Sequence, residues 1–131
     1  MEKIIRGFLV DVYDPSKSDV VVFHDTLENI YKMLNVELID VTERKIGEFT
    51  YDVVCDDEGL FKDPKYPSAF NGKGEPQLVG SLLLVNHDDE GNFASLTDEQ
   101  IEELKKNLHV CMIADDKGLH FYGALNNVEY A

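Results

Sequence analysis

Apolar and polar residues alternate near the N-terminus and predict two strands, over residues 4–13 and 20–23. The apolar residues that share one face of the first strand are Ile4, Phe8, Val10 and Val12. Residues 14–18, between the strands, contain a proline and short polar side chains, which favour a turn. We therefore expect the two strands to form a hairpin with a long loop.

A helical period follows between residues 25 and 34, where apolar residues recur at spacings of three and four. The stripe consists of Leu27, Ile30, Tyr31 and Leu34. Asp25 and Glu28 have the spacing of a capping box, in which each side chain bonds a backbone N–H of the other residue. The sequence thus predicts a helix that begins at Asp25 and stops at Asn35.

Strand-like patterns return at residues 36–41 and 49–55. Residues 56–77 contain three prolines and several glycines, and we expect one long irregular loop there. Residues 78–85 are nearly all apolar, a pattern that favours a central strand covered on both faces.

The clearest element is a second helix after residue 96. Thr97 and Gln100 have capping-box spacing, and Leu96 with Ile101 forms the accompanying hydrophobic staple. Leu104 continues the apolar face of this helix. Two further strands, at 110–114 and 119–122, are expected to close the chain as a hairpin.

The resulting order, β-β-α-β-β-β-α-β-β, predicts an α+β fold. We expect a mainly antiparallel sheet of about six or seven strands, with both helices packed on one face. A chain of 131 residues fits a single domain over residues 1–131.

An Asp-Asp pair ends three of the expected strands, and a glycine follows each pair. The three turns are Asp56-Asp57-Glu58-Gly59, Asp88-Asp89-Glu90-Gly91 and Asp115-Asp116-Lys117-Gly118. Ordinary turn chemistry explains them, because aspartate accepts amide hydrogen bonds and glycine tolerates positive φ. They lack the alternating ligands of a calcium loop. If the strands before the first two turns are parallel, both turns form one acidic patch; if antiparallel, the charge is divided between the two ends of the sheet.

Charge is the unusual property of the composition. Twenty-six acidic residues against twelve basic ones give a net charge of −14. Such a surface repels DNA and RNA, so we expect no direct nucleic-acid binding, but it attracts the basic groove of a nucleic-acid-binding protein. Solubility is the simpler interpretation of the same charge.

No apolar run approaches the roughly 18 residues of a membrane helix, and the N-terminal residues do not resemble a signal peptide. We therefore expect no membrane partner and a location in the bacterial cytoplasm.

Metal-binding and catalytic motifs are weak. Cys55, His87, His109 and Cys111 can supply soft ligands for zinc only if their strands adjoin, and no Cys-x-x-Cys spacing exists. Two reduced, structural cysteines are the alternative interpretation. No nucleophile motif or phosphate loop stands out. We therefore expect no cofactor and no enzymatic activity.

Several ordered motifs resemble a known family. These are Pro67-Ser68-Ala69, Gly74-Glu75-Pro76, Leu78-Val79-Gly80, Glu90-Gly91-Asn92 and the run from Ser95 to Ile101. Together they resemble the family catalogued as domain of unknown function 3846. The resemblance implies a small accessory protein of phages, mobile elements or gut bacteria, a setting in which inhibitors of host defence are common. It transfers no catalytic residues.

These observations lead to a first hypothesis: a non-enzymatic phage or mobile-element protein that binds and inhibits a host nucleic-acid-binding defence protein, of the anti-CRISPR or anti-restriction type. The contacts we expect are acidic: Asp56, Asp57, Glu58, Asp88, Asp89, Glu90, Glu99, Glu102 and Glu103. The alternative is a small-ligand or metal-binding accessory protein, such as a nucleotide sponge, with residues 56–77 as a lid. The sequence leaves the oligomeric state open.

Overall fold

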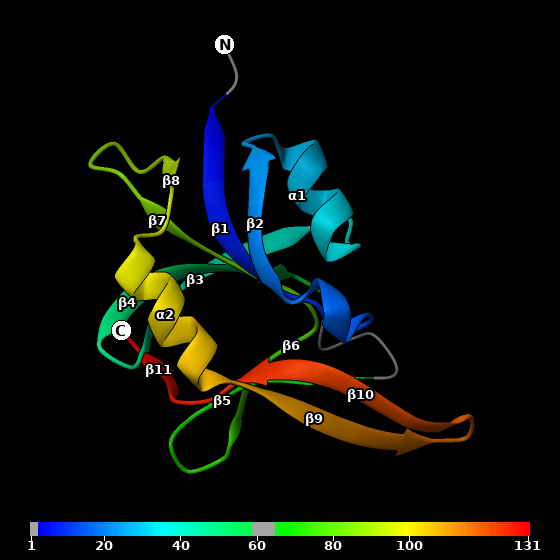
Figure 1. Cartoon of the computed structure of the whole chain (residues 1–131). Coiled ribbons are helices and arrows are strands. Elements are labelled where there is room, and N and C mark those ends of the chain that lie inside the picture. The colour runs from blue at the N-terminus through cyan, green and yellow to red at the C-terminus, as the bar shows by residue number, and fades with distance from the viewer. Residues whose placement is uncertain (1–2, 59–64) are drawn as a thin grey trace.

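The computed structural model describes residues 3–58 and 65–131, which form strands, two α-helices and one 3-10 turn (Figure 1). The helical elements are η1 (Pro15–Lys17), α1 (Leu27–Leu34) and α2 (Asp98–Asn107). The strands are β1 (Ile4–Val10), β2 (Asp19–His24), β3 (Ile39–Ile46), β4 (Phe49–Asp56), β5 (Pro67–Phe70), β6 (Pro76–Val79), β7 (Leu82–His87), β8 (Phe93–Ala94), β9 (Leu108–Asp115), β10 (Gly118–Leu125) and β11 (Val128–Tyr130).

The strands are divided between two sheets. The larger has seven strands in the order β11-β3-β4-β7-β1-β2, with β8 paired to β7, and every pairing in it is antiparallel. The smaller has the order β6-β5-β10-β9, and its β5–β10 pairing is parallel. The expectation of an α+β fold with a mainly antiparallel sheet is confirmed. The described residues form eleven strands instead of about seven, because β5, β8 and β11 were not predicted and the strand predicted at 78–85 is divided into β6 and β7.

The two helices cover opposite faces of the larger sheet, which corrects the expectation that both lie on one face. Alternate residues of β7 separate into two clusters: Leu82 and Leu84 pack with α2, while Leu83 and Val85 pack with α1. The same alternation occurs in β1 and β4. The central strands are therefore buried on both faces, which explains why their sequence lacks a polar face.

The ends of the helices follow local side-chain chemistry. Thr97 Oγ1 accepts a hydrogen bond from Gln100 N, and Gln100 Oε1 accepts one from Thr97 N, so the predicted capping box is confirmed. The first helix differs from the prediction by one residue. Thr26, rather than Asp25, is its N-cap and accepts a bond from Asn29 N at 3.2 Å. Asn35 ends the helix as expected, with a left-handed φ of 55°.

The predicted strand at 78–85 is two strands in two different sheets. Gly80 has φ +81°, and this turn residue separates β6, in the smaller sheet, from β7, in the larger one. The predicted loop at 56–77 likewise contains β5 and the start of β6; its residues 59–64 lie outside the described residues. The strand expected at 36–41 begins at Ile39 and extends to Ile46, where a turn at Gly47 (φ +62°) leads into β4.

Candidate functional site

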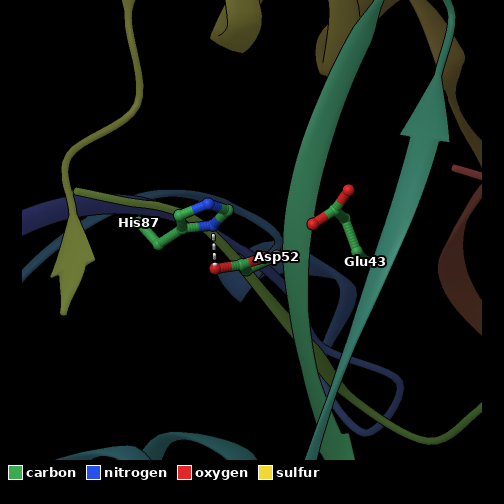
Figure 2. Close-up of side chains that lie close together, drawn as sticks. All are labelled: Glu43, Asp52 and His87. Carbon is green, nitrogen blue, oxygen red and sulfur yellow. Dashed lines mark hydrogen bonds and ion pairs between the residues drawn. The ribbon is translucent and has the colours of Figure 1, made fainter. Parts of the chain in front are cut away.

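One cluster joins titratable side chains from three neighbouring strands. Glu43 of β3, Asp52 of β4 and His87 of β7 each place a potential ligand atom within 4.8 Å of the other two. Figure 2 shows the Glu43 carboxylate directed toward the pair formed by Asp52 and His87. His87 Nδ1 lies 2.9 Å from Asp52 Oδ2. Among the described residues, this is the one group of three or more such side chains close enough to hold a metal ion.

Strand register creates the cluster. Glu43 and Asp52 are directly opposite each other in the β3–β4 ladder, and Asp52 is opposite Val85 in the β4–β7 ladder. His87 lies two residues beyond Val85, so it projects from the same face as Asp52. On this face α1 packs over Val54 and Val85. The side chains of Glu43 and His87 remain exposed, whereas the Asp52 side chain is only 11% exposed.

The buried carboxylate sets the electrostatics of the cluster. The hydrogen bond to Asp52, and then its negative charge, raise the pKa of His87 above its ordinary value, with smaller contributions from Glu43 and Asp88. His87 therefore stays protonated to a higher pH than a free histidine does, in an arrangement in which an imidazolium donates to a carboxylate. As a chemical unit, the cluster offers one imidazole nitrogen and two carboxylates to an incoming cation.

The four residues named from the sequence as weak zinc candidates do not come together in the structure. Cys55 belongs to the core cluster on one face of the larger sheet and lies beside Leu78 and Val79 of β6, while His87 lies on the opposite face. Burial raises the pKa of Cys55 to about 11, as expected for a structural thiol. His109 and Cys111 do meet, with Nε2 and Sγ 3.3 Å apart, but they belong to the smaller sheet. Both cysteines are free thiols.

The acidic turns also lie apart. Because β4 and β7 are antiparallel, the turn that follows Asp56 and the turn that follows His87 are at opposite ends of the larger sheet. The single acidic patch is therefore absent, and the hypothesis of partner binding through these six acidic residues loses its geometric support. The turns do show the expected local chemistry: Asp88 Oδ1 accepts bonds from Glu90 N and Asn92 N, and Gly91 has φ +84°.

The acidic residues of α2 are better grouped. A groove of about 440 Å³ lies between α2 and the β3–β4 turn, and its walls carry five carboxylates and one lysine around an aromatic ring. Gly47 allows close approach there, because a Cβ at this position would collide with the side chain of Glu103. The lining residues are Glu48, Phe49, Asp98, Glu99, Glu102, Glu103 and Lys106. Glu99, Glu102 and Glu103 of the sequence-based set are thus brought together.

The hairpin of β9 and β10 exposes an apolar surface that the sequence analysis did not identify. Met112 is opposite Phe121 and Ala114 is opposite Leu119, so their side chains share one face with Val110. We call Val110, Met112, Leu119 and Phe121 the hairpin face. Their exposed fractions are 68%, 57%, 61% and 49%. Toward the base of the hairpin the same face continues to Leu125, which is fully buried in the core.

A sequence signal for this surface existed. Both faces of β9 are apolar, because Cys111 and Ile113 pack inward while Val110 and Met112 point outward. Such a strand is either covered on both faces or leaves one apolar face exposed. The Glu43–Asp52–His87 cluster had no comparable signal, since its members are 35 or more residues apart except for Glu43 and Asp52.

Comparison with known proteins gives one result. The search of curated proteins and the search of solved structures returned no significant match. In the described part of the chain, no helix is long and apolar enough to cross a membrane. A family model described as "Domain of unknown function (DUF3846)" matches residues 5–109, most of the chain. The protein therefore belongs to the DUF3846 family.

Proposed function

We propose that this protein is a non-enzymatic binding protein whose target is a basic protein, and that the hairpin face is the centre of the contact. The hairpin face is the observation that carries the proposal. Four large apolar side chains lie side by side on two paired strands and are 49% to 68% exposed. Contiguous apolar surface of this kind in a soluble protein marks an interaction site, whereas scattered apolar residues do not.

Charge determines which partner suits this surface. The strand segments that form the hairpin face, residues 110–114 and 119–121, contain no charged residue, yet the whole protein carries a net charge of −14. A second copy of the chain would bring another −14 and repel the first. A basic protein is attracted by the same field, and apolar contact then supplies the short-range affinity. The acidic groove beside α2 adds five carboxylates to this field.

The more specific proposal is that the target is a nucleic-acid-binding defence protein of the host. A DNA or RNA channel is strongly cationic because its lysines and arginines neutralise phosphates, and an acidic protein would compete with nucleic acid for it. Inhibition then requires only occupancy of the channel, which agrees with a protein that needs no catalytic residues. The resemblance of this chain to proteins of mobile elements supplies the biological setting.

Affinity capture tests the proposal. The baits are the wild-type chain, the double variant Met112→Lys/Phe121→Lys, and the control Leu27→Lys/Leu38→Lys, which adds the same charge at two exposed leucines outside the hairpin. Each captured protein is identified, purified and tested for direct binding at low and moderate salt, with and without DNA or RNA as competitor. We expect the captured protein to be a basic nucleic-acid-binding protein. It should bind the wild type and the control but not the hairpin variant, and DNA or RNA should displace it.

Two outcomes contradict the proposal. Equal binding of the hairpin variant and the control places the contact elsewhere. Self-association of the wild type that strengthens with salt, measured by light scattering and lost in the hairpin variant, identifies a second copy as the occupant. Salt dependence distinguishes a basic partner from a second copy of the chain. Screening by salt weakens binding to a basic partner, but it strengthens self-association because it weakens the repulsion between identical acidic chains.

A second candidate function, metal binding, is favoured by a separate observation, the cluster of Glu43, Asp52 and His87.

A further inference from the structure

We propose that Glu43, Asp52 and His87 form a binding site for a divalent transition-metal ion of the zinc type. The three side chains come from three adjacent strands of one sheet and project from the same face. Glu43 and Asp52 are paired in the β3–β4 ladder, and His87, two residues beyond the last β4–β7 pair, is paired with Phe93 of β8, so each ligand residue lies on a hydrogen-bonded strand. The site is independent of the hairpin face, which belongs to the smaller sheet.

The donor set selects the class of ion. Imidazole nitrogen is a good ligand for zinc and neighbouring transition metals, whereas magnesium and calcium prefer oxygen ligands throughout. One histidine with two carboxylates leaves further positions for water, because zinc takes at least four ligands. Exposure of Glu43 and His87 gives the ion a direct entry path from solvent.

The distances suit one ion after small movements. Any two ligand atoms of a tetrahedral zinc ion are about 3.4 Å apart, since each bond is about 2.1 Å long. The three candidate atoms already lie within 4.8 Å of one another. Glu43 is exposed and has a long side chain, so rotation about its bonds can bring its carboxylate to the ion. His87 and Asp52 are 2.9 Å apart in their hydrogen bond, so a bound ion would replace the shared proton and the two ligand atoms would move slightly apart.

Electrostatics gives a reason for a cation at this position. Glu43 and Asp52 are like charges directly opposite each other on paired strands, an arrangement that destabilises a sheet. The Asp52 side chain is nearly nine-tenths buried, which strengthens the repulsion. The ion pairs of the described residues include none between either carboxylate and a lysine or arginine. One imidazolium offsets at most one of the two negative charges. A divalent ion between the two carboxylates would offset both charges and so remove the repulsion between them.

A bound ion would join β3, β4 and β7 through their side chains. It would therefore stabilise the centre of the larger sheet next to α1, in addition to the backbone ladders. This role needs neither a catalytic step nor the partner proposed above, so the two proposals succeed or fail separately.

Calorimetric titration of the chelator-treated full chain with Zn²⁺ tests the site. We expect one ion per chain, with affinity at least about tenfold lower in His87→Ala and in Glu43→Gln, since even loss of a supporting residue around a metal costs that much. Both changes are at exposed positions, and circular dichroism of the metal-free variants checks that they fold. His24→Ala, at another exposed histidine, is the control and is expected to bind as the wild type does.

The pair of His109 and Cys111 is the competing zinc site, and Cys111→Ser tests it. Loss of zinc binding in Cys111→Ser, with binding kept in His87→Ala and Glu43→Gln, overturns the proposal. Failure of the wild-type chain to bind Zn²⁺ also overturns it. With Co²⁺ as the probe, visible absorption bands typical of nitrogen and oxygen ligands support the cluster, whereas an intense thiolate charge-transfer band assigns the ion to Cys111.

Discussion

His87 Nδ1 lies 2.9 Å from Asp52 Oδ2, and this contact connects the neighbouring strands β7 and β4. Hydrogen bonding to Asp52 raises the pKa of His87, and the charges of Asp52, Glu43 and Asp88 act in the same direction. The folded protein therefore holds the imidazolium proton more tightly than the unfolded chain does. The stabilisation is fully present below the unfolded pKa of about 6.5 and is lost as the pH rises through the folded pKa.

The first prediction follows for the metal-free protein. The wild type should exceed His87→Ala in stability by the largest margin below the unfolded pKa of about 6.5, and the difference should decrease as the pH rises through the folded pKa of His87. NMR titration of the His87 ring, with denaturation midpoints at each pH, provides the measurement. A His87 pKa at or below its ordinary value, or a difference that grows with pH, would contradict this assignment.

The second prediction concerns the contact between the larger sheet and α2. The buried Tyr51 hydroxyl donates to the backbone carbonyl of Gln100 at 2.8 Å. Tyr51→Phe removes this bond and should lower the free energy of unfolding by about 1 kcal/mol. Leu104→Ala, at a fully buried position of α2, should cost about 2–5 kcal/mol because it leaves a cavity. Urea denaturation measures both changes. Tyr130→Phe, at a mostly exposed tyrosine, is the control and should change little.

The third prediction distinguishes two assignments of the first helix start. Thr26 is the N-cap in the structure, whereas the sequence pattern indicates Asp25. Thr26→Ala should therefore destabilise the protein by about 1 kcal/mol, and Asp25→Ala should have a much smaller effect. The same denaturation experiment compares the two. If Asp25→Ala is the more destabilising change, the helix begins one residue earlier than the structure shows.

The fourth prediction concerns the two thiols. Burial raises the pKa of Cys55 to about 11 and also raises that of Cys111, which is less buried. Iodoacetamide reacts with thiolate, so at pH 8 Cys111 should be alkylated first and Cys55 should react far more slowly. Peptide mass spectrometry measures both rates, and denaturation should bring them together. Faster labelling of Cys55 in the folded protein would exclude its position in the core.

Local signals in the sequence were sufficient for part of the fold. The capping box of Thr97 and Gln100 and the stop at Asn35 depend on neighbouring residues, and both are present as predicted. The prediction of one strand across Gly80 was wrong, because an apolar run indicates that residues are buried but not to which sheet they belong. The placement of the helices was wrong for a similar reason, since strands apolar on both faces require cover on both.

Pairing between strands that are distant in the sequence explains why the sequence did not predict the candidate metal site or the separation of the acidic turns. Asp52 meets Glu43 and His87 only because β4 lies between β3 and β7, and the sequence gives no indication of that strand order. The acidic turns after Asp56 and His87 were correctly predicted as turns, but the antiparallel pairing of their strands separates them. Charge composition is the basis on which a basic partner is proposed, while the sheet topology determines which surfaces are available to bind one.

Hydrogen exchange of the protein with its purified partner tests the central claim most directly. If the hairpin face is the centre of the contact, backbone amides in peptides covering β9 and β10 should exchange more slowly in the complex, and Met112→Lys/Phe121→Lys should abolish this protection. The Leu27→Lys/Leu38→Lys control should retain it. Protection confined to other elements, with unchanged exchange across residues 108–125, would contradict the account.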